Sequence, residues 1–356
     1  SPYWGRLSDK TGRKPIIAAG LGAYSVSMGS FATVVIIGMM GGLTGGGLFV
    51  GLILSRAIFG AFGSASTPAA QAYVADRTHL SQRTEELAAL SAAFALGQVL
   101  GPGVCAAIAA KVGLVTPLVM TSALAAAASF TIWRFLPEPE KPAVTSAGQE
   151  GPLDALRLAA DPRLAGYLIF GFGLSVVTGT LQQVFALFTM DRLNAQGNAG
   201  AELAALGFMV SALTLLATQM AILPRLKLDV RSLMIWGTAL VALGVVIQVF
   251  APSLGGLLLS QVVQGLGFGL ARPGFTGGAS MAARPEEQGP VAGLIVAING
   301  AGFIFSPMTG AVAYQMIGMN APLLIALVLL VVMLIFAVVS RRLRAGVAMT
   351  HATIEP

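Results

Sequence analysis

The sequence predicts an all-α membrane protein built from two related six-helix bundles, with about ten of the twelve membrane-spanning helices present in these 356 residues. Two observations carry this prediction. Hydrophobic residues make up 56% of the chain and charged residues only 10%, whereas a soluble domain carries about 25% charged residues. The two halves of the chain also share a pattern of glycine, proline and serine, which is typical of one architecture built twice.

The predicted helices are apolar stretches long enough to cross about 30 Å of hydrocarbon. They cover residues 16–38, 48–75, 87–110, 114–136, 164–189, 203–224, 232–251, 254–280, 290–315 and 321–340.

The internal repeat aligns residues 52–110 with residues 257–315 at a constant offset of 205 and without a gap. Small residues and prolines carry the match, and these residues set backbone shape and allow helices to approach closely. The matched pairs are Ser55 with Ser260, Gly60 with Gly265, Pro68 with Pro273, Gly97 with Gly302, Pro102 with Pro307, Gly113 with Gly318, and Pro117 with Pro322.

A segment rich in proline and glutamate, residues 137–163, reads as a linker because its composition is unfavourable in lipid. It divides the chain into an N-terminal bundle at 1–136 and a C-terminal bundle at 164–343, which a tail at 344–356 follows. Four predicted spans precede the linker and six follow it. If the halves are equivalent, we expect the first two helices of the complete fold to precede Ser1.

Lysine and arginine predict the orientation of the spans. One set of loops, which includes the linker and the C-terminus, holds 17 of these residues and the opposite set holds two. The basic side is cytoplasmic by the positive-inside rule, so we expect a multi-pass protein of the inner or plasma membrane with a cytoplasmic C-terminus. The same loops account for the net charge of +6, and we expect no nucleic-acid partner.

The run from Gly5 to Lys14, GRLSDKTGRK, resembles the loop signature G-x-x-x-D-x-x-G-R-[RK] of the major facilitator superfamily. Two further stretches resemble the proton-coupled drug antiporters of that superfamily, the multidrug and tetracycline type. They are RAIFG at 56–60 and GQVLGPG at 97–103, followed by Cys105 and Ala106 where the family commonly has two glycines. The resemblance implies the major facilitator fold.

The first motif predicts a gate on the cytoplasmic face. Gly5 and Gly12 allow a positive φ in a tight turn, and Asp9 can accept charge-assisted hydrogen bonds from the arginine and lysine side chains around it. The resemblance implies a relay from Asp9 through Arg13 to Asp76. The alternative is that the basic residues only signal topology. The gate motif comprises Gly5, Asp9, Gly12, Arg13, Lys14 and Asp76.

Arg56 lies inside a predicted span, where an ionised side chain is costly and counts as a functional-site hypothesis. The resemblance assigns it to proton coupling. The alternative is that Arg56 reaches an interface or pairs with carbonyls. No carboxylate lies deep in a span, so the proton carrier is expected in helices before Ser1 or at Asp76.

Gly97, Gly101, Pro102 and Gly103 predict a stiff hinge, because glycines allow helices to touch and proline bends one of them. Ordinary helix packing is the alternative.

The substrate cavity is predicted from polar residues in the spans, since the resemblance implies that the first, fourth, seventh and tenth helices line it. The candidates are Gln71, Gln182, Gln183, Gln261, Gln264 and Arg272, with aromatic walls from Phe170, Phe172, Phe185, Phe188 and Phe268. Each aromatic can instead pack or face lipid.

The sequence contains no catalytic, nucleotide-binding or metal-binding pattern, so we expect neither an enzyme nor a cofactor. The predicted function is secondary active transport, the proton-coupled efflux of drugs or other small organic molecules by alternating access. The alternatives are a facilitator or proton symporter for metabolite uptake and a truncated pseudo-transporter that does not transport. The expected partners are the substrate, protons and membrane lipids, and we expect a monomer.

Overall fold

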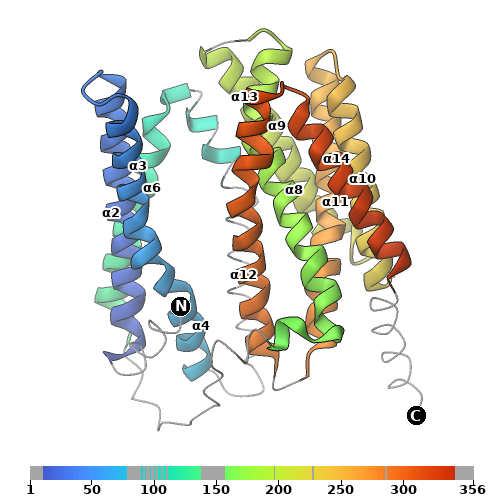
Figure 1. Ribbon diagram of the computed structural model, residues 1–356. Helices are drawn as coiled ribbons and strands as arrows, with labels where there is room; N and C mark the ends of the chain where they lie inside the picture. The colour runs from blue at the N-terminus through green and yellow to red at the C-terminus, as the bar shows by residue number, and fades with distance from the viewer. Residues whose placement is uncertain are drawn as a thin grey trace. The chain divides into compact units, whose positions relative to one another are not determined.

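The structure is a computed structural model that describes residues 11–77, 90, 93, 97, 101, 103–105, 107–109, 111–137, 157–195, 197–226, 228–284 and 287–340. All regular elements in these ranges are helices. Contacts group the chain into two compact units, one of Ser1–Gly101 with Ile108–Ala147 and one of Pro102–Ala107 with Gly148–Pro356. Within each unit the long helices run side by side as a bundle (Figure 1).

In its described residues the first unit contains four α-helices and a short 3₁₀ turn. They are α2 (Arg13–Met39), α3 (Gly45–Ala61), η1 (Gly63–Ala65), α4 (Ser66–Arg77) and α6 (Val115–Phe135). Serines join α2 to α6, because the Ser25 hydroxyl donates to the Ser122 carbonyl and the Ser122 hydroxyl donates to the Ser25 carbonyl, each over 2.8 Å. A reciprocal pair of this kind fixes two apolar helices without a charged group.

The second predicted span, residues 48–75, is not one continuous helix. It breaks after Ala61, and α4 starts again at Ser66. Pro68 lacks a backbone N–H and is readily accommodated in the first turn of a helix, which is the place it takes in α4. At the break a Cβ on Gly63 would lie 2.2 Å from the Phe59 ring, so a side chain at this position would have to displace that ring.

The described residues of the second unit form helices of up to 31 residues. They are α8 (Pro162–Arg192), α9 (Gly197–Ala217), the π-helical turn η2 (Thr218–Ile222), α10 (Val230–Phe250), α11 (Leu254–Ala282), α12 (Gln288–Pro307), the π-helical turn η4 (Met308–Val312), α13 (Ala313–Met316) and α14 (Ala321–Val339).

Eight helical segments in the described part of the chain are long and apolar enough to cross a membrane. They coincide with the first predicted span and with the fourth to the tenth. The third, at 87–110, lies mostly outside the described residues, as do the tail at 344–356 and the linker apart from Pro137 and residues 157–163.

The structure repeats in the two units where the sequence repeats. Gly113 and Gly318 both have a positive φ, of 103° and 135°, and each precedes a helix with a proline in its first turn. Ser55 and Ser260 are both buried. Each hydroxyl donates to the carbonyl three residues earlier, over 2.7 and 2.6 Å. The predicted internal repeat is thus present in the backbone at these positions, whereas the break between α3 and α4 has no counterpart in the continuous helix α11.

Helix α8 forms the centre of the second unit. In its apolar window 83% of the residues are buried, and it packs against α9, α11, α12 and α14. The core around it contains Leu164, Phe170, Phe188, Leu257, Phe275 and Leu330, all at most 1% exposed.

Two arginines cap neighbouring helices at the ends of this unit. Arg192 donates to the carbonyls of Ala251, over 2.9 Å, and Val249 at the end of α10. Arg231 donates to the carbonyl of Ala337 near the end of α14, over 3.0 Å. The last carbonyls of a helix have no partner within it, so these contacts satisfy groups that are costly to bury unpaired.

Candidate functional site

The predicted gate motif is described only in its second half. Gly12 has a φ of 101° and precedes α2, as predicted, and Arg13 and Lys14 form the first turn of that helix, half-buried. Gly5 and Asp9 lie outside the described residues. Asp76 belongs to the last turn of α4, but its side chain is not described. The relay from Asp9 to Asp76 therefore stays a prediction.

Beside Asp76 the end of α4 is tied to the end of α6. The Tyr73 hydroxyl donates to the carbonyl of Pro137 over 2.8 Å and accepts from the Arg77 guanidinium over 3.0 Å. Arg77 also lies over the Tyr73 ring, 5.9 Å from its centroid. These contacts hold the C-terminal end of α4, and with it the backbone of Asp76, against the end of α6.

Arg56 lies on α3 among a sulfur atom and two aromatic rings. Its Nη1 is 3.1 Å from the Met28 sulfur, and its guanidinium carbon lies 5.4 Å from the Phe59 ring centroid and 6.0 Å from that of Phe31. The side chain is exposed. Among the described side chains it contacts no carboxylate, so most of its five N–H donors remain available to a partner.

The predicted hinge is only partly described. Pro102 lies outside the described residues. A Cβ added to Gly97 or Gly101 would meet no atom within 4 Å, and Gly103 is buried. The structure therefore leaves the hinge role a prediction.

In the second unit α8 and α12 approach each other closely at small residues, and the two helices lie side by side in Figure 1. We call this contact the α8–α12 seam. A Cβ added to Gly302 would lie 2.4 Å from the Ser175 Cβ, and one added to Gly179 would lie 2.6 Å from the Ser306 Cβ. Residues four apart share one face of a helix, so these small residues bring the two backbones together.

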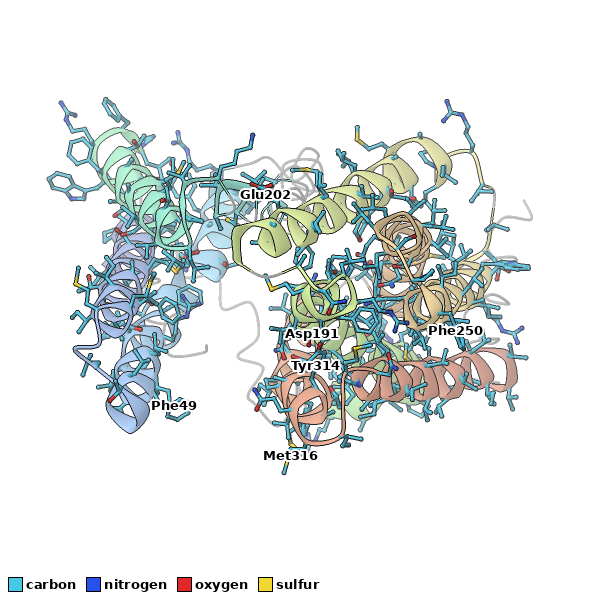
Figure 2. The ribbon with its side chains drawn as sticks, turned by 90° about the horizontal axis from the view of Figure 1, so that it is seen from above. Phe49, Asp191, Glu202, Phe250, Tyr314 and Met316 are labelled. Atoms are coloured by element: carbon cyan, nitrogen blue, oxygen red, sulfur yellow. The ribbon has the colours of Figure 1, made fainter. Side chains whose placement is uncertain are left out.

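Polar side chains join the two helices along this seam. The contacts are Ser175 to Asn299 over 2.7 Å, Thr180 to Thr309 over 2.5 Å, and Gln183 to Ser306 over 3.1 Å. Their sequence separations are 124, 129 and 123, which is the pattern of two helices that run in the same direction. Past η4, the Tyr314 hydroxyl donates to Asp191 over 2.5 Å, and Figure 2 shows the two residues next to each other.

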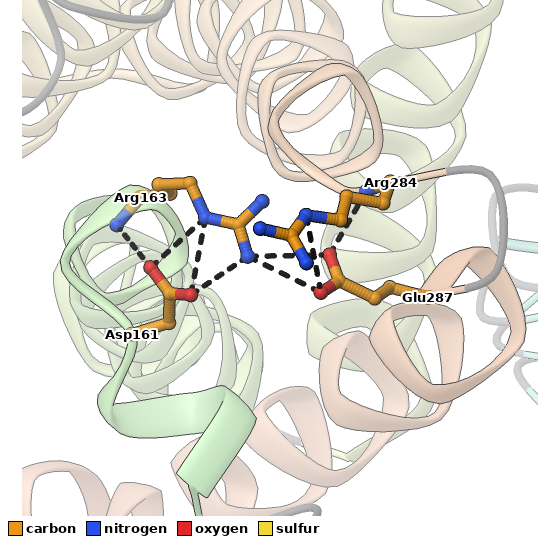
Figure 3. A network of polar contacts seen from close by, with 4 residues as sticks. All are labelled: Asp161, Arg163, Arg284 and Glu287. Atoms are coloured by element: carbon orange, nitrogen blue, oxygen red, sulfur yellow. Dashed lines mark hydrogen bonds and ion pairs between the residues drawn. The ribbon is translucent and has the colours of Figure 1, made fainter.

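At the amino-terminal end of the seam, Asp161, Arg163, Arg284 and Glu287 form the charge network of Figure 3. Arg163 lies 2.7 Å from Asp161 and 3.2 Å from Glu287. Hydrogen bonds from Arg163 lower the pKa of Asp161. The backbone N–H of Arg284, followed by the Arg163 side chain, lowers the pKa of Glu287. The network thus links the start of α8 to the segment between α11 and α12.

Two amides of the predicted cavity, Gln182 and Gln183, are exposed on α8 although most of that helix is buried. Aromatic side chains lie near the seam as well. Phe172 packs edge to face with Phe305 at 5.7 Å between ring centroids, and Phe303 is 42% exposed. The surface of the seam therefore combines amides with aromatic rings.

The other cavity candidates lie elsewhere. Gln264 is buried between α10 and α11 and donates to Gln248 over 2.8 Å. Gln261 is buried too, and Arg272 is half-buried near the middle of α11. The side chain of Gln71 is not described. A role for these four residues in binding substrate stays a prediction.

Four of the five candidate aromatic walls are buried, and their role in a binding site stays a prediction. They are Phe170, Phe185, Phe188 and Phe268. These side chains belong to the packed interior around α8. Only Phe172 keeps partial exposure.

Sequence reasoning missed the partners across the seam, above all Ser306 and Tyr314. A signal was present in the spacing of four between Ser175 and Gly179 and between Gly302 and Ser306. Such stripes predict a close helix contact, but they do not identify the partner helix.

The sequence model described as the Major Facilitator Superfamily matches residues 1–228 of the 356-residue chain. The chain belongs to the major facilitator superfamily. The family and the fold are those of transporters, not enzymes, and members of this superfamily move small organic substrates. With its apolar helices, the chain is a multi-pass membrane protein.

Curated relatives of this transporter include resistance proteins. Multidrug resistance protein 2 of Bacillus subtilis is 28% identical over 328 residues, which cover 89% of this chain and 76% of the relative. Quinolone resistance protein NorA of Staphylococcus aureus is 26% identical over 334 residues, covering 92% and 80%. Tetracycline resistance protein, class B, of Escherichia coli is 24% identical over 325 residues, covering 88% and 75%.

Solved structures show the same fold. A bacterial homolog of the human lysosomal transporter Spinster, inward-facing and unoccupied, aligns with a TM-score of 0.72 at 16% identity, covering 96% of this chain and 86% of that one. The human organic anion transporter MFSD10 (TETRAN) aligns with a TM-score of 0.64 at 20% identity, covering 94% and 79%.

Proposed function

We propose that this major facilitator is a secondary active transporter that exports drugs or other small organic molecules in exchange for protons, by alternating access. Its membership of the superfamily supports transport. The names of its relatives, which are multidrug, quinolone and tetracycline resistance proteins, support drugs as the substrate class.

The observation that carries the proposal is the exposed amide pair on α8. Gln183 lies nine residues before the end of this 31-residue helix, which is about 14 Å at 1.5 Å per residue. A carboxamide that faces hydrocarbon without a hydrogen-bond partner costs roughly 2–7 kcal/mol. This face of α8 is therefore expected to border a cavity that water or substrate fills.

Arg56 supports the coupling part of the proposal. An ionised side chain within a span is unfavourable in free energy and marks a functional-site hypothesis. The described neighbours of Arg56 are Met28, Phe31 and Phe59. A charge in this setting shifts the proton affinity of a nearby carboxylate when screening is poor. The carboxylate that exchanges the proton is expected in a part of the protein that the structure does not describe.

The test is transport in inside-out vesicles that contain the full-length protein, with tetracycline and a quinolone as the first probes. An uncoupler should abolish uphill movement and spare downhill exchange. Arg56→Ala should imitate the uncoupler. Arg134→Ala is the matched control, because Arg134 lies in the last turn of α6 over Phe135 and should leave uphill transport intact.

Two results would contradict the proposal. If Arg56→Ala transports uphill normally, or if uphill movement follows sodium and ignores the proton gradient, proton antiport is wrong. Proton-driven movement in the opposite direction would favour the alternative of a symporter for uptake.

A further inference from the structure

The hydrogen bonds around Ser306 fix which atom of Gln183 is free. Gln183 Nε2 lies 3.1 Å from Ser306 Oγ, and the Ser306 hydroxyl donates to the carbonyl of Phe303 over 3.0 Å. A serine hydroxyl has one hydrogen. Since that hydrogen bonds Phe303, Ser306 can only accept from Gln183, so the amide nitrogen must face Ser306.

Pro307 explains why the Ser306 hydrogen goes to Phe303. In a regular helix the N–H of residue 307 would bond the carbonyl of residue 303, but proline has no N–H. The next N–H, of Met308, bonds the carbonyl of Phe305 instead. The Phe303 carbonyl thus needs a donor, and the Ser306 side chain supplies it.

The other end of the amide, Gln183 Oε1, is an acceptor without a donor among the described residues. This oxygen lies 3.1 Å from the position that a Cβ added to Gly310 would take. Because Gly310 has no side chain, none occupies that position, and Gln183 is an exposed residue.

An aromatic ring lies one turn away from this oxygen. The Phe303 ring sits 3.1 Å from the position of a Cβ on Gly179, and Gly179 precedes Gln183 by four residues on the same face of α8. With 42% of its surface exposed, Phe303 offers an apolar face next to a fixed acceptor.

We propose that Gln183 Oε1 is a specificity-determining acceptor, oriented by Ser306, for a hydrogen-bond donor such as the ammonium or hydroxyl group of an aromatic or apolar substrate. Gln183 touches the substrate, and Ser306 is a positioning residue that keeps the amide from turning its NH₂ group outward. This inference rests on the proposed function for the identity of the site.

The test compares two compounds of equal charge, a phenylalkyl ammonium that carries N–H donors and its quaternary trimethylammonium analogue. Binding to the purified full-length protein is measured by calorimetry, and competition with transport of a fluorescent tracer is measured in vesicles. The wild type should prefer the N–H compound by about 3- to 10-fold, the value of one hydrogen bond.

The variants separate recognition from folding. Gln183→Leu should bring the preference close to one, and Gln183→Glu, which keeps an acceptor, should retain or raise it. Ser306→Ala should lower the preference, because the amide then turns freely. Gln182→Leu is the matched control, since no hydrogen bond to a described residue orients the neighbouring amide as Ser306 orients Gln183. It should alter the affinities for both compounds alike.

A wild type that binds both compounds equally, or neither, would overturn the inference, and so would an unchanged preference in Gln183→Leu. A protein that shows the preference in calorimetry yet moves no tracer would instead overturn the proposed transport. The two failures are therefore distinguishable.

Discussion

Replacing Gly302 by alanine tests how closely α8 and α12 approach. The new Cβ would lie 2.4 Å from the Ser175 Cβ and 3.0 Å from two backbone atoms, the Ser175 carbonyl carbon and the Val176 nitrogen. Backbone atoms cannot swing aside as a flexible side chain does, so the helices must separate. Gly300 lies on the same helix, and a Cβ there would meet nothing within 4 Å.

The expected magnitude follows from the difference between the two variants. Both gain about 1 kcal/mol or less of helix propensity when glycine becomes alanine, and this gain cancels between them. What remains is the strain of an overpacked contact, about 1–3 kcal/mol. At about 2–4 °C per kcal/mol for a unit of this size, Gly302→Ala should melt about 2–12 °C below Gly300→Ala.

The assay is thermal unfolding of the purified protein in detergent, followed by tryptophan fluorescence and repeated with a bound probe. Gly300→Ala should melt at or slightly above the wild-type temperature. If both variants melt together, the backbones of α8 and α12 do not touch at Ser175, and the seam is looser than described.

Two further predictions concern charge. The pKa values of both carboxyl groups in the charge network are lowered, so its stabilisation should be constant above about pH 5 and be lost as the pH falls below about 4. In Glu287→Gln the melting temperature should fall less at acid pH than it does in the wild type. If its pH dependence equals that of the wild type, the network is not the cause of the acid destabilisation. In a Cys105→Ser background, cysteines at Gly46 and Gly255 should react with an impermeant external reagent while one at Gln149 should not. The reverse pattern would overturn the orientation.

Much of the fold could be predicted because apolar length and repeated small residues are local properties of the sequence. The positive φ of Gly113 and Gly318 illustrates this. Both glycines follow an apolar stretch and precede a proline at the same spacing, so the sequence indicates the same turn in each half. A backbone conformation that only glycine adopts easily leaves a clear trace in the residues.

The break after Ala61 and the contacts of Ser306 could not be predicted in the same way. Apolar composition continues through Phe62, but residues 63–68 read GSASTP, so the sequence held a signal for the break that the length rule alone passed over. The role of Ser306 depends on which helix faces α12 and on the carbonyl that Pro307 leaves without a donor. Such pairings are tertiary, and a single sequence without its partner helix does not determine them.

The repeat also shows where the two units differ. Ser55 and Ser260 occupy equivalent places and make the same hydrogen bond, so the next residue starts from the same backbone in each unit. That residue is Arg56 in the first unit, exposed beside aromatic rings, and Gln261 in the second, buried. At this position the difference lies in the side chains, although the backbones diverge further on, where α3 ends at Ala61 and α11 continues to Ala282. We therefore expect proton coupling to depend on the charge of the first unit and substrate recognition on the amides of the second.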